Sequence, residues 1–381
     1  MQISIKGFIT NKETEFYSDC ADRYAVNPKL HRFAISDGVS ISFFPKYWSE
    51  ILVNKYTQKE DLSHENGLGD IVEECQIEWM AKVKEQLEKP DVKWYTKSSF
   101  NRKSPALATF AGLRFIKEEG SWKWEAMAIG DSFIFFLSEK SEPPITISSK
   151  SVDTPFDNFP DYLTSIGEKH KGVWEKNKGD LRNGCFYLMT DALAEWFLKN
   201  NEIAGKKIEL LNSQEDFTQL IEKERASGSL SNDDSALLII MVDNHEDDII
   251  SYGSHTVSDI QELINVQERN QFNSNLSIEE NNILLLSEPD NLTKEECESA
   301  EAMIIGKENK PIENNELIAS NEEDGINNDS TELLQETGIE NENIPYLVDS
   351  TQLTSPKKLP EIEYDLNDSS SPRKKSIIDK F

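Results

Sequence analysis

The feature that most constrains this chain is a set of aspartates placed at the ends of apolar, strand-like runs. The runs and their aspartates are Phe33–Ile35 before Asp37, Ala126–Ile129 before Asp131, Phe186–Met189 before Asp191, and Ala236–Ile240 after Asp233 and Asp234. A single aspartate at such a place is usually a turn former or a helix N-cap. Several carboxylates drawn together repel one another, so a shared site requires a bound cation. Hard oxygen ligands favour Mg²⁺ or Mn²⁺ over zinc, and the sequence therefore predicts a divalent-metal site.

Charge and cysteine content bound the class of protein. The chain of 381 residues carries a formal net charge of -30, which excludes the basic surface of a nucleic-acid-binding domain. Its 4 cysteines form no Cys-x-x-Cys pair, so neither a cysteine-based zinc site nor a disulfide scaffold is expected. The first residues lack a signal-peptide core, and no apolar run approaches the roughly 18 residues that span a bilayer. We therefore expect a cytoplasmic protein with reduced thiols and without membrane or nucleic-acid partners.

Composition changes near residue 245 and divides the chain into two regions. All 7 tryptophans lie at or before Trp196. Residues 251–381 carry 28 acidic and 10 basic residues and are rich in Asn, Glu and Ser. Such a segment buries too little apolar surface to offset its chain entropy. We expect a globular, monomeric domain over residues 1–244 and an acidic, mostly disordered tail over residues 245–381, with a short basic segment at its end.

Short apolar runs and helical periodicity predict an α+β fold for the first region. The expected strands are Phe33–Ile35, Ala108–Phe115, Trp122–Ile129, Phe133–Leu137, Cys185–Met189 and Ala236–Val242. The expected helices are Tyr47–Tyr56, Ile71–Leu87, Ala192–Lys199 and Glu215–Glu224. Because the strands cluster and the two long helices come early, this order favours α+β over alternating βαβ units. Residues 141–182 contain many prolines and glycines and little periodicity, which predicts a flap-like loop at the active site.

Five short motifs occur in an order known from one enzyme family. They are Cys20-Ala21-Asp22-Arg23, Asp37-Gly38-Val39-Ser40, Gly130-Asp131-Ser132, Thr190-Asp191-Ala192 and Asp233-Asp234-Ser235. Each motif alone is weak, but together over residues 1–244 they resemble those of the metal-dependent protein phosphatases of type 2C, the PPM family. The resemblance implies two packed antiparallel β-sheets flanked by helix pairs. It also implies a metal cleft at one end of the sandwich.

The resemblance assigns the direct metal ligands. Asp37 would bridge two Mn²⁺ or Mg²⁺ ions, and the Gly38 carbonyl would help to hold one of them. Asp191 and Asp233 would ligate the other ion. The implied activity is hydrolysis of phosphoserine and phosphothreonine in protein substrates by in-line attack of a water that bridges the metals. Asp37, Asp191 and Asp233 would then form the catalytic set.

The remaining acidic residues have auxiliary roles in this comparison. Asp22 would act on the metals through water. Asp131, Asp191 and Glu195 match positions that hold a weaker third metal in some family members. Asp234 would only neighbour the centre. The sequence thus offers ligands for two ions and a weak third.

The chain departs from the family pattern where that family grips phosphate. The arginine expected about five residues before the early aspartate is absent near Tyr17, and Ala21 replaces the usual acidic or amide residue. Ser40 and Ala192 replace glycines of the pattern. A bidentate phosphate clamp is therefore missing or comes from elsewhere. Conceivable substitutes, each more simply explained as solvated surface, are Arg23, Arg32 and Lys46.

Two other functions stay open at this point. One is a phosphatase of the same fold that acts on small molecules or on another phosphorylated regulator. The other is a catalytically weak or silent module that binds a partner through its cleft or its C-terminal tail. Retention of three mutually repelling carboxylates argues against silence. The basic residues 371–381 are either a solvated terminus or a short motif that docks a protein partner, with the acidic stretch as its tether.

Overall fold

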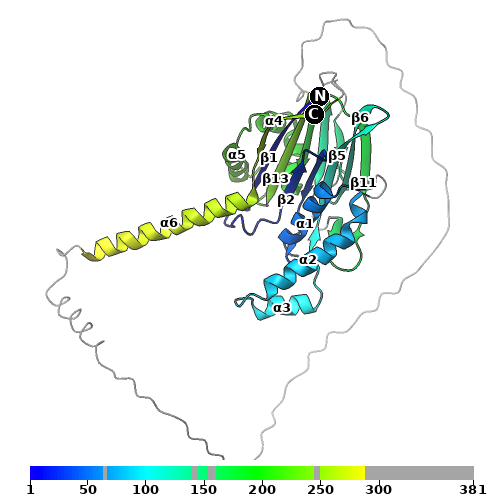
Figure 1. Ribbon diagram of the computed structural model, residues 1–381. Helices are drawn as coiled ribbons and strands as arrows, with labels where there is room; N and C mark the ends of the chain where they lie inside the picture. The colour runs from blue at the N-terminus through cyan, green and yellow to red at the C-terminus, as the bar shows by residue number, and fades with distance from the viewer. Residues whose placement is uncertain are drawn as a thin grey trace, which may run out of the picture. The chain divides into compact units, whose positions relative to one another are not determined.

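The computed structural model describes residues 1–62, 67–138, 144–152, 154, 156, 160–243 and 249–287. Over these residues the chain folds into two large β-sheets, one small sheet and six α-helices (Figure 1). No described helix combines the length and the apolar composition that crossing a membrane requires. The expected disorder of residues 288–381 and the basic C-terminal segment lie outside the described residues.

The first large sheet has six strands in the order β14-β1-β13-β12-β7-β8. Their bounds are β1 Gln2–Thr10, β7 Phe133–Ser138, β8 Ile145–Ile147, β12 Gly184–Met189, β13 Ser235–Asp243 and β14 Ser251–Val257. All neighbours pair antiparallel except β1 and β14, which run parallel. This sheet therefore combines strands from the beginning, the middle and the end of the described chain.

The second large sheet has five antiparallel strands in the order β11-β6-β5-β3-β2. Their bounds are β2 Arg23–Asn27, β3 Arg32–Ser36, β5 Phe110–Glu118, β6 Ser121–Ile129 and β11 Glu175–Asp180. The small sheet, in the order β10-β9-β4, consists of β4 Leu107–Ala108, β9 Tyr162–Thr164 and β10 His170–Lys171. Residues 141–182 thus contribute short strands to all three sheets, where the sequence predicted a flap-like loop.

Two pairs of helices flank the sheets. The helices are α1 Pro45–Gln58, α2 Val72–Leu87, α3 Trp94–Asn101, α4 Asp191–Glu209, α5 Gln214–Ala226 and α6 Ile260–Ser287. Side chains of α1 and α2 form one apolar core with the five-stranded sheet, and those of α4 and α5 form another with the six-stranded sheet. A third core lies between the two sheets. This confirms the predicted α+β sandwich flanked by helix pairs.

Strand β12 explains why the apolar runs lack polar alternation. Phe186 and Leu188 enter the core between the sheets, whereas Tyr187 and Met189 face α4 and α5. Successive side chains point to opposite faces of a strand, and both faces of this strand are buried. A strand covered on both sides therefore appears in sequence as a continuous apolar run.

The described structure continues past residue 244, where the sequence predicted the end of the domain. Strand β14 adds an edge strand to β1, and Ile260 and Leu263 of α6 pack against the core between the sheets. The Tyr24 hydroxyl donates a hydrogen bond to the Ser258 carbonyl, at 2.6 Å. Hydrogen bonding and packing thus tie residues 251–263 to the sandwich.

Candidate metal centre

Antiparallel pairing brings several strand ends to the same end of the sandwich. Strands β1, β3, β6 and β12 end there, and β2 and β13 begin there. Pairs that fix this register are Thr10 with Ser235, Arg23 with Ser36, Phe110 with Ile129, and Met189 with Leu237. The residues next to these ends include Asp22, Asp37, Asp131, Asp191, Asp233 and Asp234. The predicted convergence of the aspartates is therefore a consequence of strand register.

Asp37 and Gly38 are held against the chain segment that enters β5. The Thr109 amide donates to the Asp37 carbonyl at 2.9 Å, and Gly38 forms an isolated bridge with Ala108. A Cβ added at Gly38 would lie 2.9 Å from the Pro45 Cβ and 3.0 Å from the Ala21 carbonyl oxygen. The glycine after Asp37 is thus required by close packing.

Asp191 is the first residue of α4. Its carboxylate accepts a hydrogen bond from the Ala192 amide at 2.5 Å. Ala192 lies inside the helix, so the alanine that replaces a family glycine adopts an ordinary helical conformation. The helix N-terminus also favours a negative charge at this position.

Burial and mutual repulsion together set the electrostatics of this cluster. Burial, followed by the charges of Asp191, Asp22, Asp131 and Asp233, raises the pKa of Asp37 well above its usual value. Burial and the charges of Asp131 and Asp233 likewise raise the pKa of Asp191, against the Ala192 amide and Lys12, which lower it. Like charges this close oppose the ionised form of each neighbour. The cluster is therefore short of positive charge.

Asp22 is the aspartate of the cluster with both carboxylate oxygens buried and unpartnered in the described part of the chain. It is 1 % exposed, and neither carboxylate oxygen has a hydrogen-bond partner among the described residues. Burial and the nearby Asp234 and Asp191 raise its pKa, while the Thr190 hydroxyl opposes the rise without reaching hydrogen-bond geometry. A buried carboxylate without a partner costs several kcal/mol unless a proton or a cation neutralises it.

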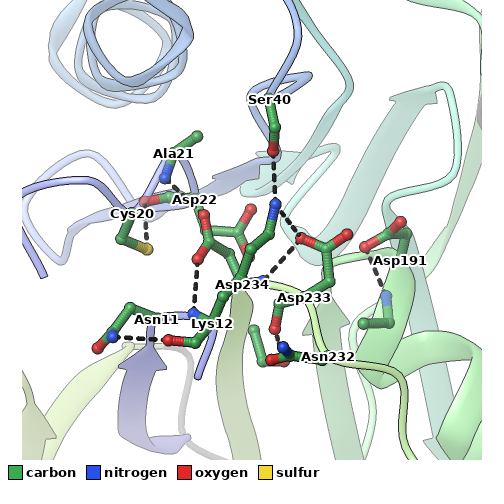
Figure 2. Close-up of polar contacts among 12 residues, drawn as sticks. Asn11, Lys12, Cys20, Ala21, Asp22, Ser40, Asp191, Asn232, Asp233 and Asp234 are labelled. Carbon is green, nitrogen blue, oxygen red and sulfur yellow. Dashed lines mark hydrogen bonds and ion pairs between the residues drawn. The ribbon is translucent and has the colours of Figure 1, made fainter. Parts of the chain in front are cut away.

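Lys12 supplies a cation inside the cluster (Figure 2). Its ammonium lies 3.0 Å from Asp233 Oδ1 and donates to Ser40 Oγ at 2.7 Å. Burial lowers the pKa of Lys12, but the hydrogen bond and charge of Asp233, with Asp234 and Glu15, raise it on balance. Asp233 is thus ion-paired in this structure.

Asp234 is satisfied by the backbone. Its carboxylate accepts hydrogen bonds from the Ala21 amide at 2.7 Å and the Lys12 amide at 3.0 Å. Arg225 donates to the carbonyls of Asn11, at 2.9 Å, and of Asp233. These contacts fix the segment after β1 against the segment before β13, which places Lys12 beside Asp233.

The three predicted substitutes for the phosphate-binding arginine all donate hydrogen bonds to backbone carbonyls. Arg23 donates to the carbonyls of Cys20 and Asp22, at 2.7 and 2.6 Å, and Lys46 donates to the Ser18 carbonyl at 2.7 Å. Arg32 donates to carbonyls at the end of α1, those of Tyr56, Lys59 and Glu60. Glu195, one turn after Asp191, pairs with Lys199 at 2.8 Å. The sequence did not single out Lys12 as a residue of the site, because its only signal is its position two residues after the end of β1.

The donor set fits divalent cations. Carboxylate oxygens are hard ligands. Burial, followed by an excess of negative charge, raises the pKa values of Asp22 and Asp37. Asp22 also has two buried oxygens without a partner among the described residues. Among the described residues, no three His, Cys, Asp or Glu side chains already converge as metal ligands. Binding an ion would therefore require carboxylates of the cluster to turn, and Lys12 to release Asp233.

Comparison with known proteins finds remote structural likenesses. The sequence matches no protein-family model and no curated protein. Serine/threonine phosphatase Stp1 from Staphylococcus aureus is similar at 12% identity, over 63% of this chain and 94% of that chain, with a TM-score of 0.43. The Mycobacterium tuberculosis serine/threonine phosphatase PstP/Ppp is similar at 13% identity, over 63% of this chain and 99% of that chain, with a TM-score of 0.41. The S. agalactiae serine/threonine phosphatase is similar at 14% identity, over 63% of this chain and 100% of that chain, with a TM-score of 0.41. At these low identities and TM-scores, the function proposed for this chain rests on its own aspartates.

Proposed function

We propose that this protein is a metal-dependent phosphatase that hydrolyses phosphoserine and phosphothreonine in protein substrates. The observation that carries the proposal is the Asp22 carboxylate, buried and without a hydrogen-bond partner among the described residues, in the middle of a cluster of aspartates. A bound divalent cation would offset the cost of burying such an unpaired carboxylate. The motifs around them, in their order along the chain, point to phosphate-ester hydrolysis.

Asp37, Asp191 and Asp233 would hold two Mn²⁺ or Mg²⁺ ions, with help from the Gly38 carbonyl. Asp22 would orient bound water, and Asp131 with Glu195 would contribute to a weaker third position. When bound, the ions would supply an activated water and neutralise the phosphoryl oxygens. The chain itself contributes the rigid strand ends that place the carboxylates. It also contributes the excess of negative charge that attracts the ions.

Lys12 is proposed to face the phosphate of the substrate. Its ammonium already lies within the cluster, 3.0 Å from Asp233 and 2.7 Å from Ser40. Once Asp233 turns to a metal ion, the Lys12 ammonium would be left without its carboxylate. Lysine binds phosphate as a point charge, without the bidentate geometry of the absent arginine.

The test of the enzyme is hydrolysis of an aryl phosphate and a phosphothreonine peptide with Mn²⁺ and with chelator. Asp37→Asn should lower kcat by at least about 100-fold, because a metal ligand is lost. Asp180→Asn is the matched control, since Asp180 is an exposed carboxylate paired with Arg182. Absence of turnover in the parent protein, together with no Mn²⁺ binding in calorimetry, would overturn the proposal.

The role of Lys12 is tested separately with Lys12→Met. We expect KM for the aryl phosphate to rise about tenfold, the effect of losing one charge-assisted contact, with a smaller change in kcat. Lys55→Met is the control, because Lys55 forms an ion pair with Glu78 on the surface of α1 and α2. An unchanged KM would exclude Lys12 from the phosphate site.

A catalytically silent binding module is the second candidate. The Lys12–Asp233 ion pair favours it, because a tethered ammonium can neutralise part of the cluster without any metal. A silent module predicts folded protein with neither turnover nor Mn²⁺ binding. Calorimetry with the full-length protein therefore distinguishes the two functions.

A further inference from the structure

Helix α3 and its flanks form an exposed surface of aromatic and basic side chains. We define the α3 surface by Lys93, Trp94, Tyr95, Lys97, Arg102 and Lys103, all of which are exposed. None of the residues of α3 is buried; Trp94 is 78% exposed and Tyr95 50%. The two rings meet edge to face with their centroids 6.1 Å apart. Adjacent exposed aromatic side chains of this size are typical of binding surfaces.

The charge of this surface contrasts with that of the chain. Residues 89–103 contain five basic residues and a single acidic one, in a protein of net charge -30. Among the described residues, no ion pair involves the basic residues of this segment. Lysines on the neighbouring helices α1 and α2, in contrast, pair with glutamates: Lys55 with Glu78, Lys59 with Glu74 and Lys82 with Glu50. Charge complementarity therefore favours an acidic partner.

The α3 surface is connected directly to the edge of the candidate metal centre. After α3, the Pro105 carbonyl accepts from the Phe43 amide at 3.0 Å, and the Leu107 carbonyl from the Val39 amide at 2.9 Å. Thr109, two residues further on, donates to the Asp37 carbonyl at 2.9 Å. An extended chain from residue 103 to residue 109 spans at most about 20 Å. Helix α3 adds about 12 Å to its far end. A polypeptide bound along α3 can thus reach Asp37 within about six to ten residues.

A second observation relates the start of this segment to Lys46. Lys46, at the beginning of α1, donates to the Ser18 carbonyl at 2.7 Å. Burial lowers the pKa of Lys46, and the charges of Arg23 and Lys89 lower it further, against the opposing charge of Asp19. Lys89 is therefore close enough to Lys46 to act on it electrostatically.

We propose that the α3 surface docks an acidic segment of the phosphoprotein substrate that also carries apolar side chains. This rests on the proposed phosphatase function. Lys93, Lys97, Arg102 and Lys103 would pair with Asp or Glu, and Trp94 and Tyr95 would contact the apolar side chains. The acidic segment would lie about six to ten residues from the phosphorylated residue, given the length of α3 and the reach of an extended chain.

A peptide fits these observations better than a nucleic acid. A polyanion longer than the patch would meet the rest of a protein with a net charge of -30, which repels it. A short acidic peptide needs to contact only α3 and the segment that leads to Asp37. The chain's own residues 311–350, with 11 acidic and no basic residues, are a competing occupant that the test must separate.

The test measures binding of a fluorescein-labelled Glu- and Leu-containing peptide, without phosphate, to the full-length protein by anisotropy. Lys93→Glu/Lys97→Glu should weaken binding by at least about tenfold. Trp94→Ala should weaken it as well, without a change of net charge. Lys29→Glu/Lys178→Glu is the matched control, because both lysines are exposed and Lys29 lies at the opposite end of β3 from Asp37. The control should stay within about twofold of the parent protein.

Steady-state kinetics tests whether binding at the α3 surface affects hydrolysis at the candidate metal centre. Phosphothreonine peptides with a Glu cluster about six to ten residues from the phosphothreonine should have a lower KM than peptides with Gln in its place. Lys93→Glu/Lys97→Glu should abolish this difference and leave aryl phosphate hydrolysis unchanged. If the protein hydrolyses no substrate but still binds the acidic peptide specifically, the phosphatase function is refuted. The α3 surface would then remain a binding site for acidic peptides.

Four results would overturn the docking proposal. These are equal binding of the Gln-containing peptide, equal loss in the control variant, tighter binding of an oligonucleotide with the same lysine dependence, or tighter peptide binding when the acidic residues of 311–350 are replaced by amides. The last result would assign the surface to the internal segment. If binding remains specific for the acidic peptide in every comparison, the result supports docking of an acidic substrate segment at the α3 surface.

Discussion

The two ends of strand β6 use the same backbone conformation in different surroundings. Gly120 precedes the strand with φ +85, and a Cβ there would have no neighbour within 4 Å. Gly130 follows it with φ +88, and a Cβ there would lie 2.5 Å from the Asp161 carbonyl oxygen and 2.6 Å from Thr109 Cβ. Asp131 comes next and is 1 % exposed. At the aspartate end the turn is therefore fixed by packing, whereas at the far end it depends on local conformation alone.

Replacing each glycine by alanine should give the largest difference in stability between the two ends of β6. Gly120→Ala adds only backbone strain and should cost about 1 kcal/mol. Gly130→Ala adds a clash with Asp161 and Thr109 and should cost about 3 kcal/mol or more. Urea denaturation of both variants measures the difference. Similar losses would mean that the packing around Gly130 can yield.

A second prediction compares two buried carboxylates within the aspartate end. Asp234→Asn weakens acceptance of the hydrogen bonds from the Ala21 and Lys12 amides and should lower the free energy of unfolding by about 2 kcal/mol. Asp22→Asn removes no hydrogen bond and replaces a carboxyl whose ionised form is repelled by its neighbours, so in chelator it should leave stability unchanged or raise it. Urea titrations with chelator test this order. The reverse order would contradict the view that ionised Asp22 is repelled by its neighbours.

The pH dependence should be the smallest of the three effects. The pKa values of Asp22, Asp37 and Asp191 are raised by burial and by neighbouring carboxylates. The metal-free folded protein thus holds protons above pH ~4, where unfolded carboxyls have released them. The free energy of unfolding should therefore fall as the pH rises through this window, by about 1 kcal/mol between pH 5 and 7.

Urea titrations of the chelated protein at the two pH values measure this slope. Asp22→Asn should reduce it, whereas Asp180→Asn, at an exposed and ion-paired site, should not. Saturating Mn²⁺ should reverse the slope, because protons compete with the metal for the same oxygens. A slope that Asp22→Asn leaves intact would assign the proton uptake to other groups.

Segments with a strong local signal were predicted correctly. The expected strands over β3, β5, β6, β7, β12 and β13 are confirmed, as are the expected helices within α1, α2, α4 and α5. Strand β14 was missed because Ser251–Val257 has no apolar run and gains its order from pairing with β1. Helix α3 was missed because it buries no side chain and so has no apolar periodicity.

The aspartates at strand ends are a property of the sequence, because an apolar run and the residue that ends it are local features. Their surroundings are a property of the tertiary structure. The pairing of β1 with β13 brings Lys12 next to Asp233 and gives Asp234 its backbone donors, across more than 200 residues of chain. The tertiary structure also leaves Asp22 buried and unpaired among the described residues. Local sequence determines which carboxylates end a strand, whereas long-range strand register decides which of them are neutralised.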